Sequence, residues 1–280
     1  MHILRTITGI QDQIVTIRRG KMTIGLVPTM GALHDGHLSL IRACKAENDL
    51  TVVSIFVNPT QFNDPEDFKR YPRDFERDIA ILRDQACDLV FAPSNEEMYP
   101  EPDKRIFGFG ALERIMEGKH RPGHFNGVAQ VVSKLFEIIK PDKAYFGQKD
   151  FQQLVIIREL VKRLDLGIKI VSCPIVRESD GLAMSSRNQL LAGKQRIAAA
   201  GISRALEKAV SLSGTMDVES LKDFITREID SDPLLETEYF EIVDERTLNP
   251  VSDWSEETGK IACVAVRVGT VRLIDNMKIS

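Results

Sequence analysis

Short apolar runs alternate with longer amphipathic segments along the first part of the chain. The runs at residues 23–27, 50–57, 88–92, 144–146 and 168–173 are continuously hydrophobic instead of alternating. Such runs are typical of strands that are buried on both faces. The segments between them predict helices at 38–48, 74–85, 127–140 and 151–164. Because strands and helices alternate, we expect right-handed crossovers and a Rossmann-like, doubly wound parallel sheet of the α/β class.

The pattern changes after Pro174. Two helical segments, at 193–211 and 218–229, precede three strand-like runs at 236–243, 260–268 and 271–274. The pair Gly269-Thr270 between the last two runs predicts a tight hairpin. Helices followed by antiparallel strands indicate a smaller C-terminal α+β domain. We therefore expect two domains, residues 1–175 and residues 176–280.

Composition and charge exclude several classes of protein. The 280 residues carry 37 Lys and Arg against 41 Asp and Glu, a net charge of −4, without a dense basic cluster, so we expect no nucleic-acid partner. No apolar stretch approaches the roughly 20 residues that cross a bilayer, and no signal peptide is indicated. The four cysteines share no metal-ligand spacing, which favours reduced, buried thiols. We expect a soluble, cytoplasmic protein without a membrane partner.

The segment from Pro28 to His37 follows the carboxyl end of the first predicted strand. Open α/β sheets bind their ligands beyond the carboxyl ends of their strands. His34 and His37 stand three residues apart at a helix start, so their rings can point the same way. The N–H groups and the dipole of that helix end favour an anion, and imidazoles can donate hydrogen bonds to phosphate oxygens. A surface turn with two solvated histidines is the alternative. The position between a buried strand and a helix favours the phosphate site.

Two more polar segments follow predicted strands. Asn58 and Gln61 offer neutral donors and acceptors suited to hydroxyls and a carboxylate, although Asn58-Pro59 also makes a plain turn. Lys149 lies beside another helix N-terminus and is a phosphate candidate. Asp150 and Gln153 have a second explanation, because Asp-x-x-Gln also resembles a capping box at the start of that helix.

The junction between the predicted domains contains Met184-Ser185-Ser186-Arg187-Asn188. Two hydroxyls followed by a guanidinium can close over a triphosphate as a mobile loop, whereas a serine-rich linker is the structural alternative. We find no nucleophile elbow for covalent catalysis. His34 and His37 have no obvious third ligand beside them, so we expect no metal held by the protein alone.

Taken in order, these motifs resemble one family. H-x-G-H at the first strand-to-helix turn, with a later Ser-rich basic loop, is similar to the superfamily of nucleotidylyltransferases and class I aminoacyl-tRNA synthetases. Five ordered motifs narrow the resemblance to the pantoate–β-alanine ligase (pantothenate synthetase) family. They are PTMGALHDGHLSLI, FVNPTQF, EGKHRPGHFNGV, FGQKDFQQL and IVRESDGLAMSSRN.

The resemblance implies a ligase of pantothenate and coenzyme A biosynthesis. The carboxylate of (R)-pantoate would attack the α-phosphorus of ATP, bound with Mg²⁺, to give pantoyl adenylate and pyrophosphate. The amine of β-alanine would then attack the activated carbonyl to give pantothenate and AMP, with no covalent enzyme intermediate. Residues 1–175 would bind ATP and pantoate, and residues 176–280 would form a lid domain. The family is typically homodimeric.

The resemblance also implies roles for single residues. His37 and His34 would act on the phosphates together with Lys149 and Arg187, with His37 as the usual proton donor. Gln61 and Gln153 would hold pantoate, with Asn58 and Arg121 as further candidates, and Gln61 would also contact β-alanine. ATP would be bound by Met30, Gly31, Ala32, Leu33, His34, Asp35, Gly36, His37, Gly147, Gln148, Lys149, Asp150, Val176, Met184, Ser185, Ser186 and Arg187.

Two stretches depart from the family pattern, and two other functions stay open. Asn126 stands where relatives often carry a charged or small residue, which leaves the role of Arg121–Asn126 open, and residues 189–196 lack the usual tyrosine-leucine and acidic pattern. A nucleotidylyltransferase acting on a phosphorylated acceptor would need several cations beside the transfer site. A non-catalytic nucleotide sensor would need no amides for binding an acceptor.

Overall fold

The computed structural model describes residues 1–279, which form two compact units. The first unit comprises Met1–Gln148 and Gln153–Pro174, and the second comprises Lys149–Gln152 and the chain from Ile175 onward. The division at Pro174 lies beside the one expected from the sequence pattern. The grouping of Lys149–Gln152 with the second unit has no counterpart in that pattern. None of the helices described is long and apolar enough to cross a membrane.

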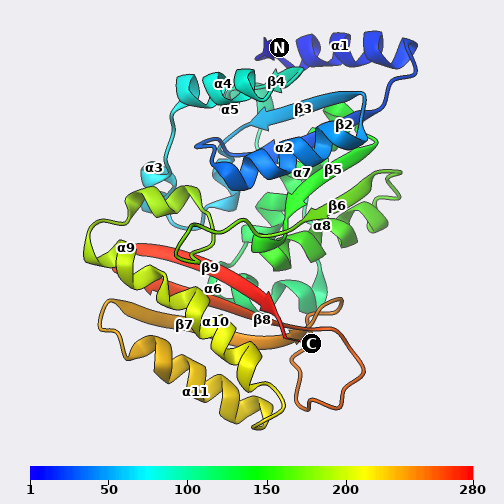
Figure 1. The fold of residues 1–280 in the computed structure, drawn as a ribbon. Helices are drawn as coiled ribbons and strands as arrows, with labels where there is room; N and C mark the ends of the chain where they lie inside the picture. Colours follow the sequence, from blue (N-terminus) through cyan, green and yellow to red (C-terminus); the bar gives the residue numbers. More distant parts are fainter. Residues whose placement is uncertain (280) are drawn as a thin grey trace. The chain divides into compact units, whose positions relative to one another are not determined.

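The first unit contains a six-stranded parallel sheet (Figure 1), which confirms the predicted α/β class. Its strand order is β1-β4-β3-β2-β5-β6. The strands are β1 His2–Leu4, β2 Ile24–Thr29, β3 Leu50–Ile55, β4 Leu89–Phe91, β5 Lys143–Gly147 and β6 Lys169–Cys173. The sequence pattern did not predict β1, because that strand has three residues and none of them is fully buried.

Helices lie on both faces of this sheet. The helices before Pro174 are α1 Ile7–Arg19, α2 Asp35–Glu47, η1 Pro59–Gln61, α3 Pro65–Arg70, α4 Phe75–Asp84, α5 Asn95–Met98, η2 Gly110–Glu113, α6 Met116–His120, α7 His124–Ile139, η3 Gln148–Asp150 and α8 Phe151–Arg163. Neighbouring residues of a strand point to opposite faces of the sheet. Leu26 packs in a core formed with α1, α7 and α8, whereas Val27 packs in a second core formed with α2 and α4 (Figure 1). Both faces of each central strand are therefore apolar, as the continuous hydrophobic runs predicted.

The strand order reverses beside β2. From β2 the chain continues to β3 on one side, and β5 later pairs with the other side of β2 through Gly25 with Lys143 and Leu26 with Ala144. All these strands are parallel, so the carboxyl ends of β2 and β5 are neighbours at the same edge of the sheet. Such a switch point is where open α/β sheets bind their ligands.

The second unit packs helices on a three-stranded antiparallel sheet, β7-β8-β9. Its elements are η4 Ser186–Leu190, α9 Lys194–Ala199, α10 Gly201–Leu212, α11 Val218–Asp230, β7 Leu235–Asp244, β8 Lys260–Val268 and β9 Val271–Lys278. The helical segment predicted over 193–211 is present, but as two helices: it is interrupted at Ala200, before Gly201, and glycine is a poor helix former. The predicted hairpin is present, with Gly269 at φ 62°.

Candidate active site

The two histidines of the H-x-G-H motif lie together at the start of α2. Their ring centroids are 4.1 Å apart. His34 is the N-cap residue and its Nδ1 accepts a hydrogen bond from the N–H of Gly36 (3.2 Å), while Nδ1 of His37 accepts one from the N–H of His34 (3.3 Å). Because both Nδ1 atoms are acceptors, each neutral ring carries its proton on Nε2. The pair thus caps α2 at the helix end where an anion is favoured.

The loop before these histidines has an unusual backbone. Gly31 and Ala32 both have left-handed backbone angles, φ 79° and 50°. The carboxylate of Asp78, in α4, accepts hydrogen bonds from the N–H of Ala32 (2.9 Å) and of Leu33 (2.7 Å). Burial raises the pKa of Asp78, and the two N–H donors oppose that shift. A buried carboxylate therefore fixes the chain just ahead of His34, at a backbone conformation that is costly for alanine.

Sequence reasoning missed Asp78, although a signal was present. Asp78 stands four residues before Leu82 on the buried side of α4, next to Ile79, and the residue is 2% exposed. A carboxylate on the apolar stripe of a helix needs partners, since an unpaired charge is rarely buried. The helical pattern thus indicated that Asp78 makes a buried polar contact. It did not indicate that the contact is with the loop after β2.

We expect Asp78→Asn to weaken both folding and turnover. One amide oxygen can replace only part of the carboxylate, and the NH₂ group would face a backbone N–H, so we expect a loss of about 1–3 kcal/mol. Unfolding in urea and steady-state rates measure the two effects. Glu76→Gln, an exposed change of the same kind in the same helix, is the control and should alter neither. Equal stability and rate in both variants would remove Asp78 from the site.

Gln61 approaches the same loop from η1, after β3. Its side chain is 8% exposed, and its Nε2 lies 3.1 Å from the sulfur of Met30. Helix α7 supports η1 from behind, because Nδ1 of His124 is 2.8 Å from the carbonyl oxygen of Gln61. At Gly127 the two backbones approach so closely that an added Cβ would lie 2.6 Å from the N of Gln61 and closer still to the carbonyl of Thr60.

Asn58 is held by contacts within the protein. Its NH₂ group donates to Oε1 of Gln61 (3.3 Å) and to the carbonyl of Gly127 (3.0 Å), and its Oδ1 accepts from the hydroxyls of Tyr99 (3.0 Å) and Thr60 (3.1 Å). Burial raises the pKa of the Tyr99 hydroxyl to about 12, so it remains a donor at neutral pH. These bonds favour a role for Asn58 in supporting Gln61 over the direct pantoate contact expected from the sequence.

Arg121 and Asn126 also act on neighbouring protein groups. The Arg121 guanidinium lies 3.6 Å from a carboxylate oxygen of Glu117 and 3.3 Å from Nε2 of His124. Asn126 accepts a hydrogen bond from the N–H of Phe107 at 2.8 Å. Arg121 is thus adjacent to the histidine that supports Gln61, and Asn126 fixes the chain ahead of η2.

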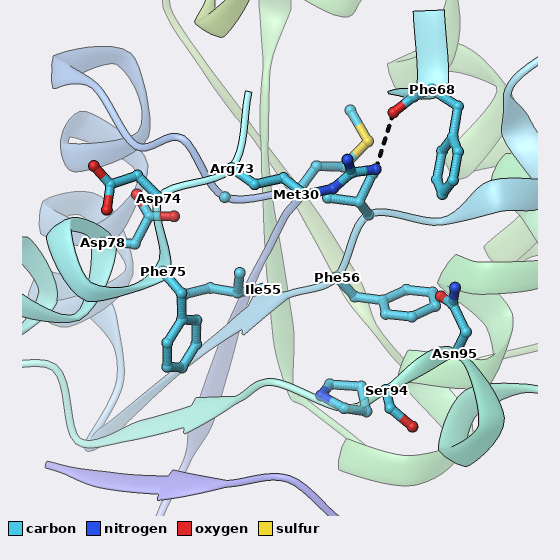
Figure 2. A pocket seen from close by; sticks show the side chains of 13 residues that line it. Met30, Ile55, Phe56, Phe68, Arg73, Asp74, Phe75, Asp78, Ser94 and Asn95 are labelled. Carbon is cyan, nitrogen blue, oxygen red and sulfur yellow. Dashed lines mark hydrogen bonds between the residues drawn. The ribbon is translucent and has the colours of Figure 1, made fainter. Parts of the chain in front are cut away.

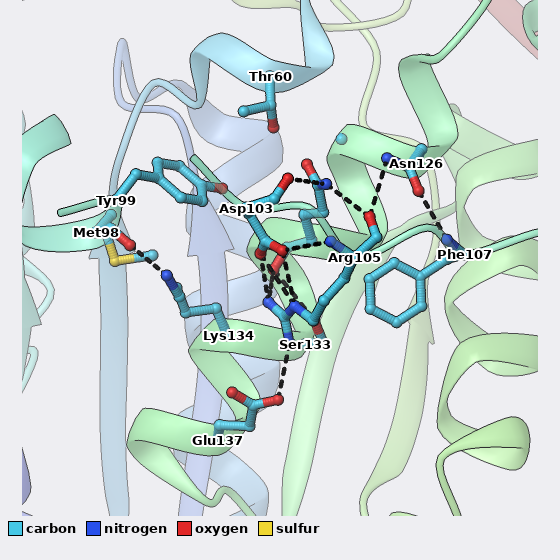
Figure 3. A network of polar contacts seen from close by, with 12 residues as sticks. Thr60, Met98, Tyr99, Asp103, Arg105, Phe107, Asn126, Ser133, Lys134 and Glu137 are labelled. Atoms are coloured by element: carbon cyan, nitrogen blue, oxygen red, sulfur yellow. Dashed lines mark hydrogen bonds and ion pairs between the residues drawn. The ribbon is translucent and has the colours of Figure 1, made fainter. Parts of the chain in front are cut away.

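A polar network holds residues 103–107, the chain segment ahead of η2, against α7 (Figure 3). The Arg105 guanidinium binds the carboxylate of Asp103 at 2.6 Å and that of Glu137 at 3.0 Å. The hydrogen bonds from Arg105 hold the pKa of Asp103 below its usual range. Gln130, from α7, donates to the carbonyls of Asp103 and Arg105 at 2.9 and 2.8 Å. The charge of Arg105 is therefore paired with two carboxylates.

A cavity of about 460 Å³ opens beyond the carboxyl ends of β2, β3 and β4. Figure 2 shows Phe75 and Asp78 from α4, with Ile55 and Phe56 at the end of β3, around this space. Met30 and Gly31 form part of its wall. The cavity therefore borders the loop that leads to the histidines, on the side where Asp78 holds it.

The second unit contains the other expected nucleotide contacts. Nζ of Lys149 lies 3.3 Å from the carboxylate of Asp150. Met184 donates its N–H to the carbonyl of Val176 (3.0 Å), so these two candidates face each other across a short hairpin. The Ser185 hydroxyl caps η4 by accepting the N–H of Arg187 at 3.2 Å.

Three candidates remain in the first unit, and a metal cage is not found. Gly147 ends β5, Gln148 begins η3 and Gln153 lies in the first turn of α8, all partly buried. Within residues 1–279, no group of three or more His, Cys, Asp and Glu side chains is arranged to hold a metal ion. The four cysteines are buried free thiols, as expected.

Known proteins resemble this chain along its whole length. The family described as pantoate-beta-alanine ligase matches residues 2–278. A pantothenate synthetase of Porphyromonas gingivalis is 51% identical over 278 residues, 99% of each chain. The crystal structure of pantothenate synthetase from Thermus thermophilus is similar with a TM-score of 0.93 and 42% identity, covering 100% of this chain and 99% of that one.

A third relative is a complex with ligands. The pantoate-beta-alanine ligase from Francisella tularensis, described as complexed with beta-gamma ATP and beta-alanine, has a TM-score of 0.84 and 37% identity, over 100% of this chain and 98% of that chain. Sequence and structure thus agree along both units with the pattern first seen in the H-x-G-H and Ser-Ser-Arg motifs. The chain belongs to the pantoate–β-alanine ligase family.

Proposed function

We propose that this protein joins (R)-pantoate to β-alanine, with ATP as the third substrate. A carboxylate oxygen of pantoate forms a bond to the α-phosphorus of ATP, and the bond from that phosphorus to pyrophosphate breaks. The β-alanine amine then forms a bond to the acyl carbon, AMP leaves with the electron pair of the C–O bond, and the amine loses its proton. The products are pantothenate, AMP and pyrophosphate.

One observation carries this proposal at the level of side chains. The amide of Gln61 lies against Met30, the first residue of the loop that ends in the histidine pair. A neutral amide suited to a hydroxy acid is thereby placed next to N–H donors suited to phosphate. An acid bound at Gln61 would have its carboxylate close to a nucleotide bound at His34 and His37, as adenylation requires.

The first unit supplies the groups for the phosphoryl step. We assign His34 and His37 to the phosphates as Nε2–H donors that stabilise charge as it develops, with His37 the proton donor. Met30–His37, Gly147 and Gln148 contact ATP, and Gln61 and Gln153 hold pantoate. Gln61 also contacts β-alanine, and Arg121 supports pantoate binding through its position next to His124.

The second unit supplies further nucleotide contacts in this proposal. Lys149 and Arg187 bind phosphate oxygens, Asp150 and residues Met184–Ser186 bind the nucleotide, and Val176 lies at the adenine end. Mg²⁺ accompanies ATP through the phosphates, which is its usual mode of binding in nucleotide sites. We assign the ion no step of its own, since the described residues offer no ready cage for it.

The other proposals concern assembly and the rival enzyme. We propose a homodimer, as the family resemblance implies, and we propose that it is located in the cytoplasm. A nucleotidylyltransferase acting on a phosphorylated acceptor is less well supported, because Arg121, which contacts the histidine behind Gln61, is paired with Glu117. A phosphate acceptor would need such cations for itself.

Formation of AMP with each acid supplied or omitted tests the function. We expect AMP only when ATP, pantoate and β-alanine are all present. With ATP and pantoate but without β-alanine, we expect slow release of pyrophosphate. Both are measured by a coupled assay and by chromatography of the nucleotides. Turnover without pantoate, or turnover that requires a phosphoester, would overturn the ligase proposal.

A further inference from the structure

Two adjacent polar residues near the end of β9 are both buried. Asp275 is 3% exposed and Asn276 is 4% exposed. Neighbouring residues of a strand point to opposite faces of the sheet, so burial of both places a polar group on each side of β9. Burial of a carboxylate and an amide is unfavourable without partners. The hydrogen-bond partners of Asp275 and Asn276 therefore indicate the role of the two residues.

Asp275 holds the hairpin that leads into the Ser-Ser-Arg segment. The guanidinium of Arg177 contacts both carboxylate oxygens, at 2.6 and 3.0 Å, and also donates to the carbonyl of Gly181 at 3.0 Å. Arg177 pairs with Ala183 across this hairpin, and Met184 follows directly. A two-pronged pair of this kind fixes direction as well as distance. The position of Met184 and the residues after it thus depends on Asp275.

Asn276 holds the segment that carries Lys149. Its side-chain NH₂ donates to the carbonyl oxygen of Lys149 at 2.9 Å. The carboxylate of Asp275 accepts the N–H of Asn276 at 2.7 Å, and Arg177 donates to the carbonyl of Asn276 at 3.3 Å. The two residues therefore form one connected network, with the Lys149 segment at one end and the hairpin of Arg177 at the other.

We propose that Asp275 and Asn276 are positioning residues for adenylation, which set the spacing between Lys149 and the Met184–Arg187 segment. This inference rests on the proposed function, in which both segments bind the phosphates of ATP. Groups that stabilise charge in a transition state must be held to within about 0.5 Å. Lys149 and Ser185 are separated along the chain by residues of the first unit, yet consecutive residues of β9 hold both segments.

The test measures pyrophosphate release from ATP and pantoate in the full-length protein. We expect Asn276→Ala and Asp275→Asn to lower the rate constant roughly tenfold to 10²-fold, as small displacements do, while the KM for pantoate changes little. Asp244→Asn is the control: that buried carboxylate holds a turn after β7 through the N–H groups of Arg246 and Thr247. It should lower stability in urea with little loss of rate. Equal losses of rate in all three variants, at matched stability, would overturn the proposal.

A double-mutant cycle gives an answer even where Asp275→Asn folds poorly. If Asn276 acts through Lys149, then Asn276→Ala should have a much smaller effect in a Lys149→Ala background than in the wild type. Effects that simply multiply would contradict the positioning role. If the wild type releases no pyrophosphate from ATP and pantoate, the proposed function is refuted. If the wild type releases it and the Asp275 and Asn276 variants do so at the same rate, only the positioning role of these two residues is refuted.

Discussion

Replacement of His37 by alanine is expected to lower the rate of pantoyl adenylate formation on the order of 10²-fold or more, as for removal of a donor that stabilises charge in the transition state. The Nε2–H of His37 is directed by the bond between its Nδ1 and the N–H of His34. Loss of the ring removes that donor and one helix-capping contact together. Pyrophosphate release in a single turnover measures the chemical step.

A second variant separates capping from catalysis. Glutamine at the third helical position can still accept the N–H of the N-cap residue, so His37→Gln should recover stability but not rate. Lys149→Ala should give a loss of rate similar to that of His37→Ala with a normal fold. His2→Ala and Lys21→Ala, at exposed positions, serve as controls. Turnover like that of the wild type in His37→Ala and Lys149→Ala would refute the proposed roles.

Gly127→Ala is expected to impair pantoate binding. The new Cβ would lie 2.6 Å from the backbone N of Gln61, so η1 and α7 must separate. Strain of this kind costs about 1–3 kcal/mol in stability. Displacement of Gln61 should raise the KM for pantoate at least about tenfold, the equivalent of roughly 1.4 kcal/mol.

The matched control for that change is Gly167→Ala. An added Cβ at Gly167 meets no atom within 4 Å, so stability and KM should stay close to those of the wild type. Unfolding in urea and initial rates against pantoate concentration measure both variants. A normal KM for pantoate in Gly127→Ala would mean that Gln61 does not hold the acid.

Much of the first unit could be predicted because its strands are apolar on both faces. The run that contains Leu26 and Val27 predicts a buried strand without knowledge of its neighbours, since each residue serves a different core. Helix α1 gave a weaker signal, because only Ile10 and Ile14 are buried along it. Elements at the margin of a sheet thus leave little trace in the pattern.

The contacts that shape the site could not be predicted in the same way. H-x-G-H indicated a phosphate site, but not that each histidine also caps α2 through Nδ1. Asp78 and Asp275 bind groups 45 to 98 positions away in the chain, at distances set by the fold. A single sequence gives the chemistry of such residues but not their partners. The roles of Asp150 and Gln153 in capping or binding stay predictions.

The grouping of Lys149–Gln152 with the second unit limits how this protein could exchange parts with its relatives. A recombinant joined at Pro174 would combine its own Lys149 with a β9 strand of foreign origin. In such a hybrid each hydrophobic core would come whole from one parent. The hydrogen bond from the Asn276 side chain to the Lys149 carbonyl would nevertheless be lost, unless the second parent carried an equivalent amide. The Lys149 segment and β9 therefore need to be inherited together, although they lie on opposite sides of Pro174 in the sequence.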